Sequence, residues 1–200
     1  MPKALLYSYF YSIMKYLIAG LGNIGPDYVH TRHNIGFDVA DALAKSLDTD
    51  FSSGKKVWIA EGKLKGRQVS IIKPTTYMNL SGEAIRYWLQ ELKIPKENLL
   101  VVTDDLALPF GTLRMKPSGG AAGHNGLTNI IECLQTEQFA RLRFGIGNNY
   151  PKGKQVDYVL GHWTTTESID LAPRVETAVE MIKSFVSAGL ALTMNTYNNK

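Results

Sequence analysis

The sequence predicts a single α/β domain of three layers, in which a twisted mixed sheet has helices on both faces. The chain has 200 residues, 44% hydrophobic and 20% charged, which suits one hydrophobic core and is short for two. Strand-like and helix-like segments alternate along it without repeats or a linker. A predicted β-hairpin adds antiparallel strands, so the sheet is not expected to be purely parallel.

The first half of the chain opens with a strand, a glycine-rich turn and a helix. Residues 15–21 form an apolar run that predicts a buried strand, and apolar spacing over residues 34–47 predicts a helix for which Asn34 is available as a cap. Residues 56–74 predict two strands around a glycine-containing turn. A loop then leads into a helix expected at residues 81–92.

The second half adds three strands and two helices. In chain order these begin with strands at residues 98–105 and 111–117, a helix at residues 127–135 and a strand at residues 140–147. Alternation along the last strand places Arg141 and Arg143 on the face opposite its apolar side chains. The T-x-x-E spacing of Thr164 and Glu167 predicts a capping box that opens one long C-terminal helix.

Composition narrows the class of protein. The formal charge of +4 and pI near 9.0 permit a nucleic-acid partner, although short basic groups such as Arg141 with Arg143 are by themselves typical of a solvated surface. One cysteine allows no intramolecular disulfide and fits a reducing, cytoplasmic setting. No apolar run is long enough to predict a membrane span. Residues 1–14 are expected to be a disordered extension before a domain at residues 15–200.

A glycine motif after the first strand raises the question of a dinucleotide cofactor. Gly20, Gly22 and Gly25 spell G-x-G-x-x-G. A pyrophosphate needs the free N–H groups of a helix directly behind the glycines, whereas here Pro26 follows and the helix starts only near Asn34. We therefore predict no cofactor, and expect glycines that shape a turn.

Polar clusters occur where predicted strands end, in "GLGN" with "TRHN", "TTYMN", "VTDD" and "GHNG". Ligands of open α/β sheets bind beyond the carboxyl ends of the strands. One histidine, a carboxylate and several carboxamides there would suit a hydrolase, although Asn and Asp also serve turns through local hydrogen bonds. His30 and His33 have no third ligand near them in the sequence, so no metal site is predicted.

The segments "GLGNIGPDYVHTRHNIGF", "KPTTYMNLSGEA", "TDDLALPFGTLRMK", "GGAAGHNGL" and "RLRFGIG" resemble, in order, the motifs of bacterial-type peptidyl-tRNA hydrolases. The resemblance runs from Lys15 to near the C-terminus. Three positions depart from the family pattern: Ile24, where a proline is common, Thr103 before Asp104, and Ala107, where an acid is usual. We expect these departures to affect contacts at the rim of the site and to spare its centre.

The resemblance implies hydrolysis of the ester between peptide and tRNA in peptidyl-tRNAs from stalled ribosomes, by a monomeric, metal-independent cytoplasmic enzyme. His33 would be the general base that activates water, and Asp104 would orient and support its imidazole. The residues implied in substrate binding are Asn23, Tyr28, Tyr77, Met78, Asn79, His124 and Asn125. Lys116 and Arg143 would hold the 5′-phosphate of the tRNA.

Two other classes of function stay open on the sequence. A related domain can lose catalysis and persist as an RNA-binding scaffold, as splicing-factor relatives of this family do in plastids. The retention of His33, Asp104 and the three asparagines argues against that alternative. A nucleotide-dependent oxidoreductase would use the glycine-rich turn, and titration with NAD(H) or NADP(H) would detect it.

Overall fold

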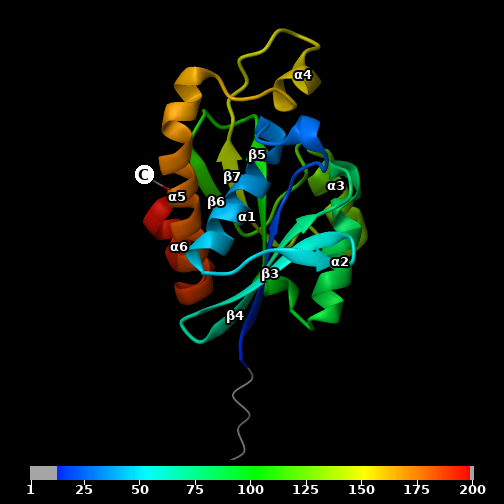
Figure 1. The fold of residues 1–200 in the computed structure, drawn as a ribbon, viewed down its shortest axis with the longest axis vertical. Coiled ribbons are helices and arrows are strands. Elements are labelled where there is room, and N and C mark those ends of the chain that lie inside the picture. The colour runs from blue at the N-terminus through cyan, green and yellow to red at the C-terminus, as the bar shows by residue number, and fades with distance from the viewer. Residues whose placement is uncertain (1–12, 199–200) are drawn as a thin grey trace, which may run out of the picture.

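The computed structural model describes residues 13–198. Their strands form one seven-stranded sheet with the order β2-β3-β4-β1-β5-β7-β6 (Figure 1). The strands are β1 (Lys15–Gly20), β2 (Ser52–Gly54), β3 (Val57–Leu64), β4 (Arg67–Pro74), β5 (Leu99–Asp105), β6 (Leu113–Lys116) and β7 (Ala140–Gly145). The central strands β4, β1, β5 and β7 run parallel, and β2, β3 and β6 add antiparallel pairs at the two edges. The predicted mixed sheet is confirmed.

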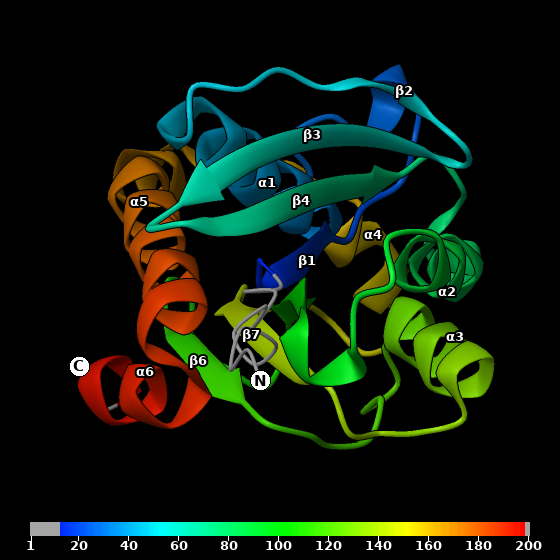
Figure 2. The same cartoon turned by 90° about the horizontal axis from the view of Figure 1, so that it is seen from below.

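Helices cover both faces of this sheet, as expected for three layers (Figure 2). The helices are α1 (Ile35–Ser46), α2 (Ser81–Glu91), α3 (Asn125–Leu134), α4 (Gln155–Val159), α5 (Thr165–Ala188) and α6 (Leu190–Tyr197). One core cluster joins α1 and α5 to the sheet, and a second joins α2 and α3 to its other face. Alternation along β1 serves both, because Ile18 belongs to the first cluster and Leu17 to the second.

Several elements differ from the sequence prediction. The short strand β2 and the short helix α4 were not expected, and α3 begins two residues early, at Asn125. The capping box of Thr164 and Glu167 is confirmed, but the predicted single C-terminal helix is two. Gly189 separates them with a φ of 88°, a backbone conformation that glycine adopts without strain.

The glycine motif lets α1 approach the end of β1. A Cβ added at Gly20 would lie 2.1 Å from the carbonyl oxygen of Gly36, and one added at Gly36 would lie 2.4 Å from the amide nitrogen of Leu21. Behind Gly25 the chain makes only a 3₁₀ turn, Pro26–Tyr28, so no α-helix N-terminus follows the motif directly. Gly20 thus permits the close packing of α1 on β1, which the sequence did not predict, while Gly25, with a φ of 112°, belongs to the turn that it did predict.

Two sequence expectations concern the chain termini and membranes. Residues 1–12 of the predicted extension lie outside the described residues, and the carbonyl of Met14 accepts a hydrogen bond from the amide of Gln68. Within residues 13–198, every helix is too short or too polar to cross a bilayer.

Replacing Gly36 with alanine tests the close approach. The added methyl meets backbone atoms of Leu21 and of Val102 rather than a flexible side chain, so we expect a loss of about 3 kcal/mol, the upper part of the usual range for overpacking. Urea unfolding followed by circular dichroism measures it. Gly120→Ala is the control, because its Cβ would meet only a side-chain oxygen at 3.6 Å. Equal stability of the two variants would contradict the packing role of Gly36.

Candidate active site

The polar clusters of the sequence converge on one cleft beyond the carboxyl ends of the parallel strands β1 and β5. The cleft has a volume of about 700 Å³. The predicted site residues that line it are Asn23, His33, Met78, Asn79, Asp104, Lys116, His124, Asn125 and Arg143. Tyr28 and Tyr77 are not part of this lining, and Tyr77 is 57% exposed. Their contact with substrate stays a prediction.

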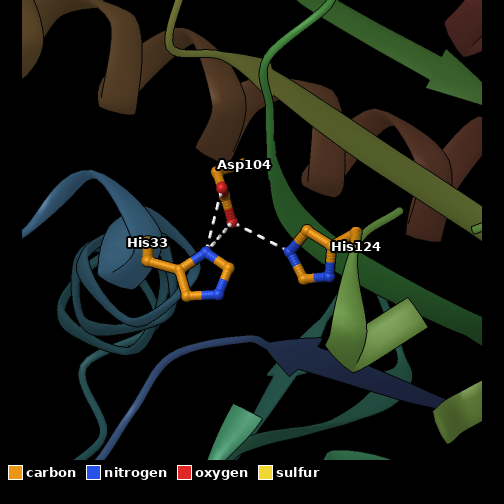
Figure 3. Close-up of side chains that lie close together, drawn as sticks. All are labelled: His33, Asp104 and His124. Atoms are coloured by element: carbon orange, nitrogen blue, oxygen red, sulfur yellow. Dashed lines mark hydrogen bonds and ion pairs between the residues drawn. The ribbon is translucent and has the colours of Figure 1, made fainter. Parts of the chain in front are cut away.

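At the centre of the cleft, His33 is hydrogen-bonded to Asp104 (Figure 3). Its Nδ1 lies 3.0 Å from each carboxylate oxygen. Because Asp104 is an acceptor, Nδ1 carries the proton and Nε2 keeps a lone pair on the side of the ring away from the carboxylate. The pair therefore has the geometry of a general base and its orienting acid.

Electrostatics favour an anionic Asp104 and a basic His33. Burial disfavours the imidazolium and lowers the pKa of His33, but the charge and hydrogen bond of Asp104 raise it, so that the net pKa lies above the usual 6.5. Burial also raises the pKa of Asp104, yet His33 and His124 together hold it well below its usual value. Asp104 is only 4% exposed, so these two rings take the place of water around its charge.

His124 approaches the same carboxylate from the N-terminus of α3. Its Nε2 lies 3.0 Å from Asp104 Oδ1 and 2.8 Å from Thr103 Oγ1, while its Nδ1 accepts the amide protons of Gly126 and Leu127. The ring is thus the side-chain cap of α3 as well as a partner of Asp104. The sequence leaves two roles open for His124, support of the helix start and contact with substrate. The cap shows the first, and contact with substrate stays a prediction.

The ring nitrogens of His33 and His124 and a carboxylate oxygen of Asp104 lie within 4.8 Å of one another, a separation that a metal ion could bridge. The hydrogen bonds of His124 do not suit that role. Its Nδ1 lone pair already accepts two amide protons, so the ring proton sits on Nε2, the atom that faces Asp104. A metal on Nε2 would require loss of that proton or of the cap.

Asn34 is a site residue that sequence reasoning missed. Instead of capping α1 with its side chain, it holds the backbone of Asn23 by two hydrogen bonds of 2.9 Å, one to the amide and one to the carbonyl. Asn23 Oδ1 in turn accepts the amide proton of Met78 at 2.8 Å. Within residues 13–198 this leaves the Asn23 Nδ2 group as a free donor at the cleft. The adjacency of Asn34 to His33 was the available signal.

The other predicted contacts differ in exposure. Asn79 and Asn125 are exposed at the cleft, and their side chains make no hydrogen bond to the described residues. Met78 is 4% exposed and packs in the second core cluster, so it closes the floor of the cleft and fills core together. Met78 thus lies where the predicted contact with substrate requires, and the contact itself stays a prediction.

Basic side chains line the far end of the cleft on β6 and β7. Arg143 is paired with Asp105, and Lys116 is exposed opposite Arg141 in the antiparallel register. The expectation that Arg141 belongs to a solvated surface is wrong, since it is 2% exposed and donates to the carbonyl of Gly120. The guanidinium of Arg141 stacks on the ring of Phe139 and supports the loop before α3. These contacts bury the side chain of Arg141.

Thr103 also lies elsewhere than expected. The sequence treats it, with Ile24 and Ala107, as a departure that affects the rim of the site. The expected position at the rim is confirmed for Ala107, which is exposed at the cleft. The same expectation is wrong for Thr103, which is 1% exposed and contacts His124 directly. The reason is its place on the central strand β5, immediately before Asp104.

Comparison with known proteins agrees with this geometry. The family described as peptidyl-tRNA hydrolase matches residues 17–200. The chain belongs to this family. A peptidyl-tRNA hydrolase of Phocaeicola vulgatus is 58% identical over 94% of this chain and 100% of its own length, and one of Gloeobacter violaceus is 43% identical over 91% and 93%. The crystal structure of the Acinetobacter baumannii peptidyl-tRNA hydrolase covers 94% of this chain and 97% of its own, with a TM-score of 0.87 at 32% identity.

The histidine–aspartate pair predicts a titration that one substitution reverses. In Asp104→Asn, burial of His33 persists while the opposing negative charge is gone, so the pKa of His33 should fall below 6.5 instead of lying above it. An NMR titration of the His33 ring measures this. Asp105→Asn is the matched control, because that carboxylate pairs with Arg143 and should leave His33 unchanged. A His33 titration that is the same in wild type and Asp104→Asn would contradict the electrostatic role of Asp104.

Proposed function

We propose that the protein hydrolyses the ester bond between peptide and tRNA in peptidyl-tRNAs released from stalled ribosomes, which recycles the tRNA. The observation that supports this most is the hydrogen bond from His33 Nδ1 to Asp104, which leaves Nε2 as a base in a cleft. Membership of the peptidyl-tRNA hydrolase family names the substrate. The free carboxamides and cations of the same cleft fit a peptide and a phosphate, respectively.

In the proposed reaction, water is the nucleophile. His33 Nε2 takes one proton of the water as its oxygen bonds to the ester carbonyl carbon, and Asp104 supports the imidazolium that forms. The tetrahedral intermediate then collapses, and its bond to the ribose oxygen breaks. The imidazolium returns the proton to that leaving oxygen. The products are the tRNA with its terminal hydroxyl restored and the free peptide acid, which releases its proton to solvent and becomes a carboxylate.

Asn23, Asn79 and Asn125 are proposed to hold the substrate around this step. Since the Oδ1 of Asn23 is occupied by the amide of Met78, Asn23 offers only its N–H groups, which suit a carbonyl oxygen or the developing oxyanion. Asn79 and Asn125 offer a donor and an acceptor each, as a peptide group requires. Contacts to the main chain of the peptide would serve substrates of any sequence.

Lys116 and Arg143 are proposed to clamp the 5′-phosphate of the tRNA. A terminal phosphate has more charge than an internal diester, so two cations can distinguish a tRNA end from continuous RNA. Asp105 holds the Nε of Arg143, while the terminal guanidinium nitrogens make no hydrogen bond within residues 13–198. Asp105 thus orients Arg143 without occupying the whole fork.

The remaining parts of the proposal concern cofactors, partners and boundaries. No step above needs a metal ion, and the proton on Nε2 of His124 opposes binding of a metal at that atom. We therefore propose a metal-independent hydrolase. We further propose that it acts as a monomer in the cytoplasm, where ribosomes produce the substrate. The catalytic domain is placed at residues 15–200, with residues 1–14 as an extension outside it.

The first test is release of peptide from purified N-acetyl-aminoacyl-tRNA in the presence of EDTA, with unblocked aminoacyl-tRNA in parallel. Cleavage of the blocked substrate alone is expected. His33→Ala should lower kcat by about 10³-fold or more, because general-base assistance is lost, and should leave tRNA affinity unchanged. In wild type, kcat/KM should rise with pH through a pKa above 6.5, since the base must be neutral. Binding of tRNA without cleavage would favour the RNA-binding scaffold.

The phosphate clamp is tested by Lys116→Ala combined with Arg143→Ala. We expect KM for full-length substrate to rise at least about tenfold with little change in kcat, because even one charge-assisted contact contributes about 1.5–3 kcal/mol and about 1.4 kcal/mol is a factor of ten. Arg114→Ala is the matched control, a cation on the same face of β6 that does not line the cleft. A substrate without the 5′-phosphate should abolish the difference between the variant and wild type. An unchanged KM in the double variant would remove the clamp.

A further inference from the structure

Thr103 lies beneath the active site as a buried hydroxyl between two site residues. It precedes Asp104 on β5, and its Oγ1 is 2.8 Å from His124 Nε2. The same hydroxyl is 3.2 Å from the main-chain carbonyl of Asp104, to which it donates. The side chain thus touches both His124 and the residue that supports the proposed base.

The protons at this junction can be assigned from the hydrogen bonds. The amides of Gly126 and Leu127 both point at His124 Nδ1, at 3.1 and 3.2 Å, so Nδ1 must hold the lone pair and Nε2 the proton. Thr103 has one hydroxyl proton, which goes to a carbonyl. Its Oγ1 must therefore accept from His124. The Nε2 proton is shared between Thr103 Oγ1 and Asp104 Oδ1.

We propose that Thr103 is a positioning residue of the reaction, because its hydroxyl diverts part of the His124 proton and so sets how strongly Asp104 can bind His33. The link between this inference and turnover rests on the proposed function. The sharing of the His124 proton between Thr103 and Asp104 does not depend on that function. A carboxylate that receives a stronger second donor has less negative charge left for the first, so the two histidines compete for Asp104.

Other charged groups near Asp104 do not provide this adjustment. The groups that face it are His33 from the turn before α1 and His124 from the start of α3. Asp105 is the neighbour on β5 and is paired with Arg143 of β7. Lys116 and Arg141 line the cleft further along, on β6 and β7. His124 thus contacts the same oxygen of Asp104 as His33, Oδ1, and the hydroxyl of Thr103 contacts His124.

Two substitutions should shift the pKa of His33 in opposite directions. In Thr103→Val the whole Nε2 proton turns to Asp104, which weakens the hold of Asp104 on His33 and lowers the pKa of His33. In His124→Asn the cap of α3 is kept, since Asn is a favoured N-cap, but the donor to Asp104 is lost, which raises the pKa of His33. A disturbance of packing alone gives no reason for opposite signs.

The measurements are an NMR titration of the His33 ring and steady-state kinetics with N-acetyl-aminoacyl-tRNA. Thr103→Val is expected to lower kcat about threefold with KM unchanged, as a weaker base is a poorer catalyst. Thr103→Ser, which retains the hydroxyl, should restore both the titration and kcat. Thr128→Val is the matched control, because its hydroxyl binds the main-chain carbonyl of His124 rather than the imidazole.

The outcomes separate this inference from the proposed function. If wild type does not cleave the substrate, the proposed function fails, and the His33 titrations still decide whether Thr103 controls the pair. Shifts of the same sign in Thr103→Val and His124→Asn, or no shift in Thr103→Val, would overturn the inference. Wild type alone gives a further test that needs no variant: ¹⁵N shifts that place the His124 proton on Nδ1 would also overturn it.

Discussion

The buried carboxylate of Asp104 is the constraint on which the rest of the site depends. A charge that is only 4% exposed is costly unless donors replace its water, and here the two imidazoles of His33 and His124 do so. Each donor must in turn be held with its N–H toward the carboxylate. The amides at the start of α3 hold His124, so a helix terminus contributes to the electrostatics around Asp104. The same charge that needs these partners raises the basicity of His33.

His33 is held in place by its neighbours in the chain. It is the middle residue of a 3₁₀ turn, Arg32–Asn34, whose members bind three different parts of the molecule. Arg32 donates to the carbonyl of His162 and to Glu167, which ties the turn to the start of α5. The side chain of Asn34 is hydrogen-bonded to the backbone of Asn23, and the side chain of Asn23 accepts the amide proton of Met78. The proposed base and a proposed oxyanion donor therefore share one hydrogen-bonded support, which suits a reaction that needs preorganised groups.

Much of this arrangement could be predicted from local sequence. Apolar runs gave the central strands, the T-x-x-E spacing gave the start of α5, and polar residues at strand ends gave the cleft. Errors occurred where the signal was not local. Thr103 is a polar residue at the end of a strand, so the sequence places it at the rim. Its burial follows from the central place of β5 in the sheet order. Arg141 resembles a surface cation, and its burial depends on a loop and a ring that fold over it.

By itself, the sequence determined the elements, the fold class, the family resemblance and the residue types of the site, because periodicity, turn chemistry and motifs act over a few neighbouring positions. Only the tertiary structure decided which nitrogen of each histidine meets Asp104, that the side-chain oxygen of Asn23 is occupied by the amide of Met78, and that Thr103 and Asn34 belong to the site. These facts depend on hydrogen bonds between segments as far apart as 71 residues, the separation of His33 and Asp104. The direction in which each side chain points arises only when such segments pack together, and no spacing along the chain specifies it.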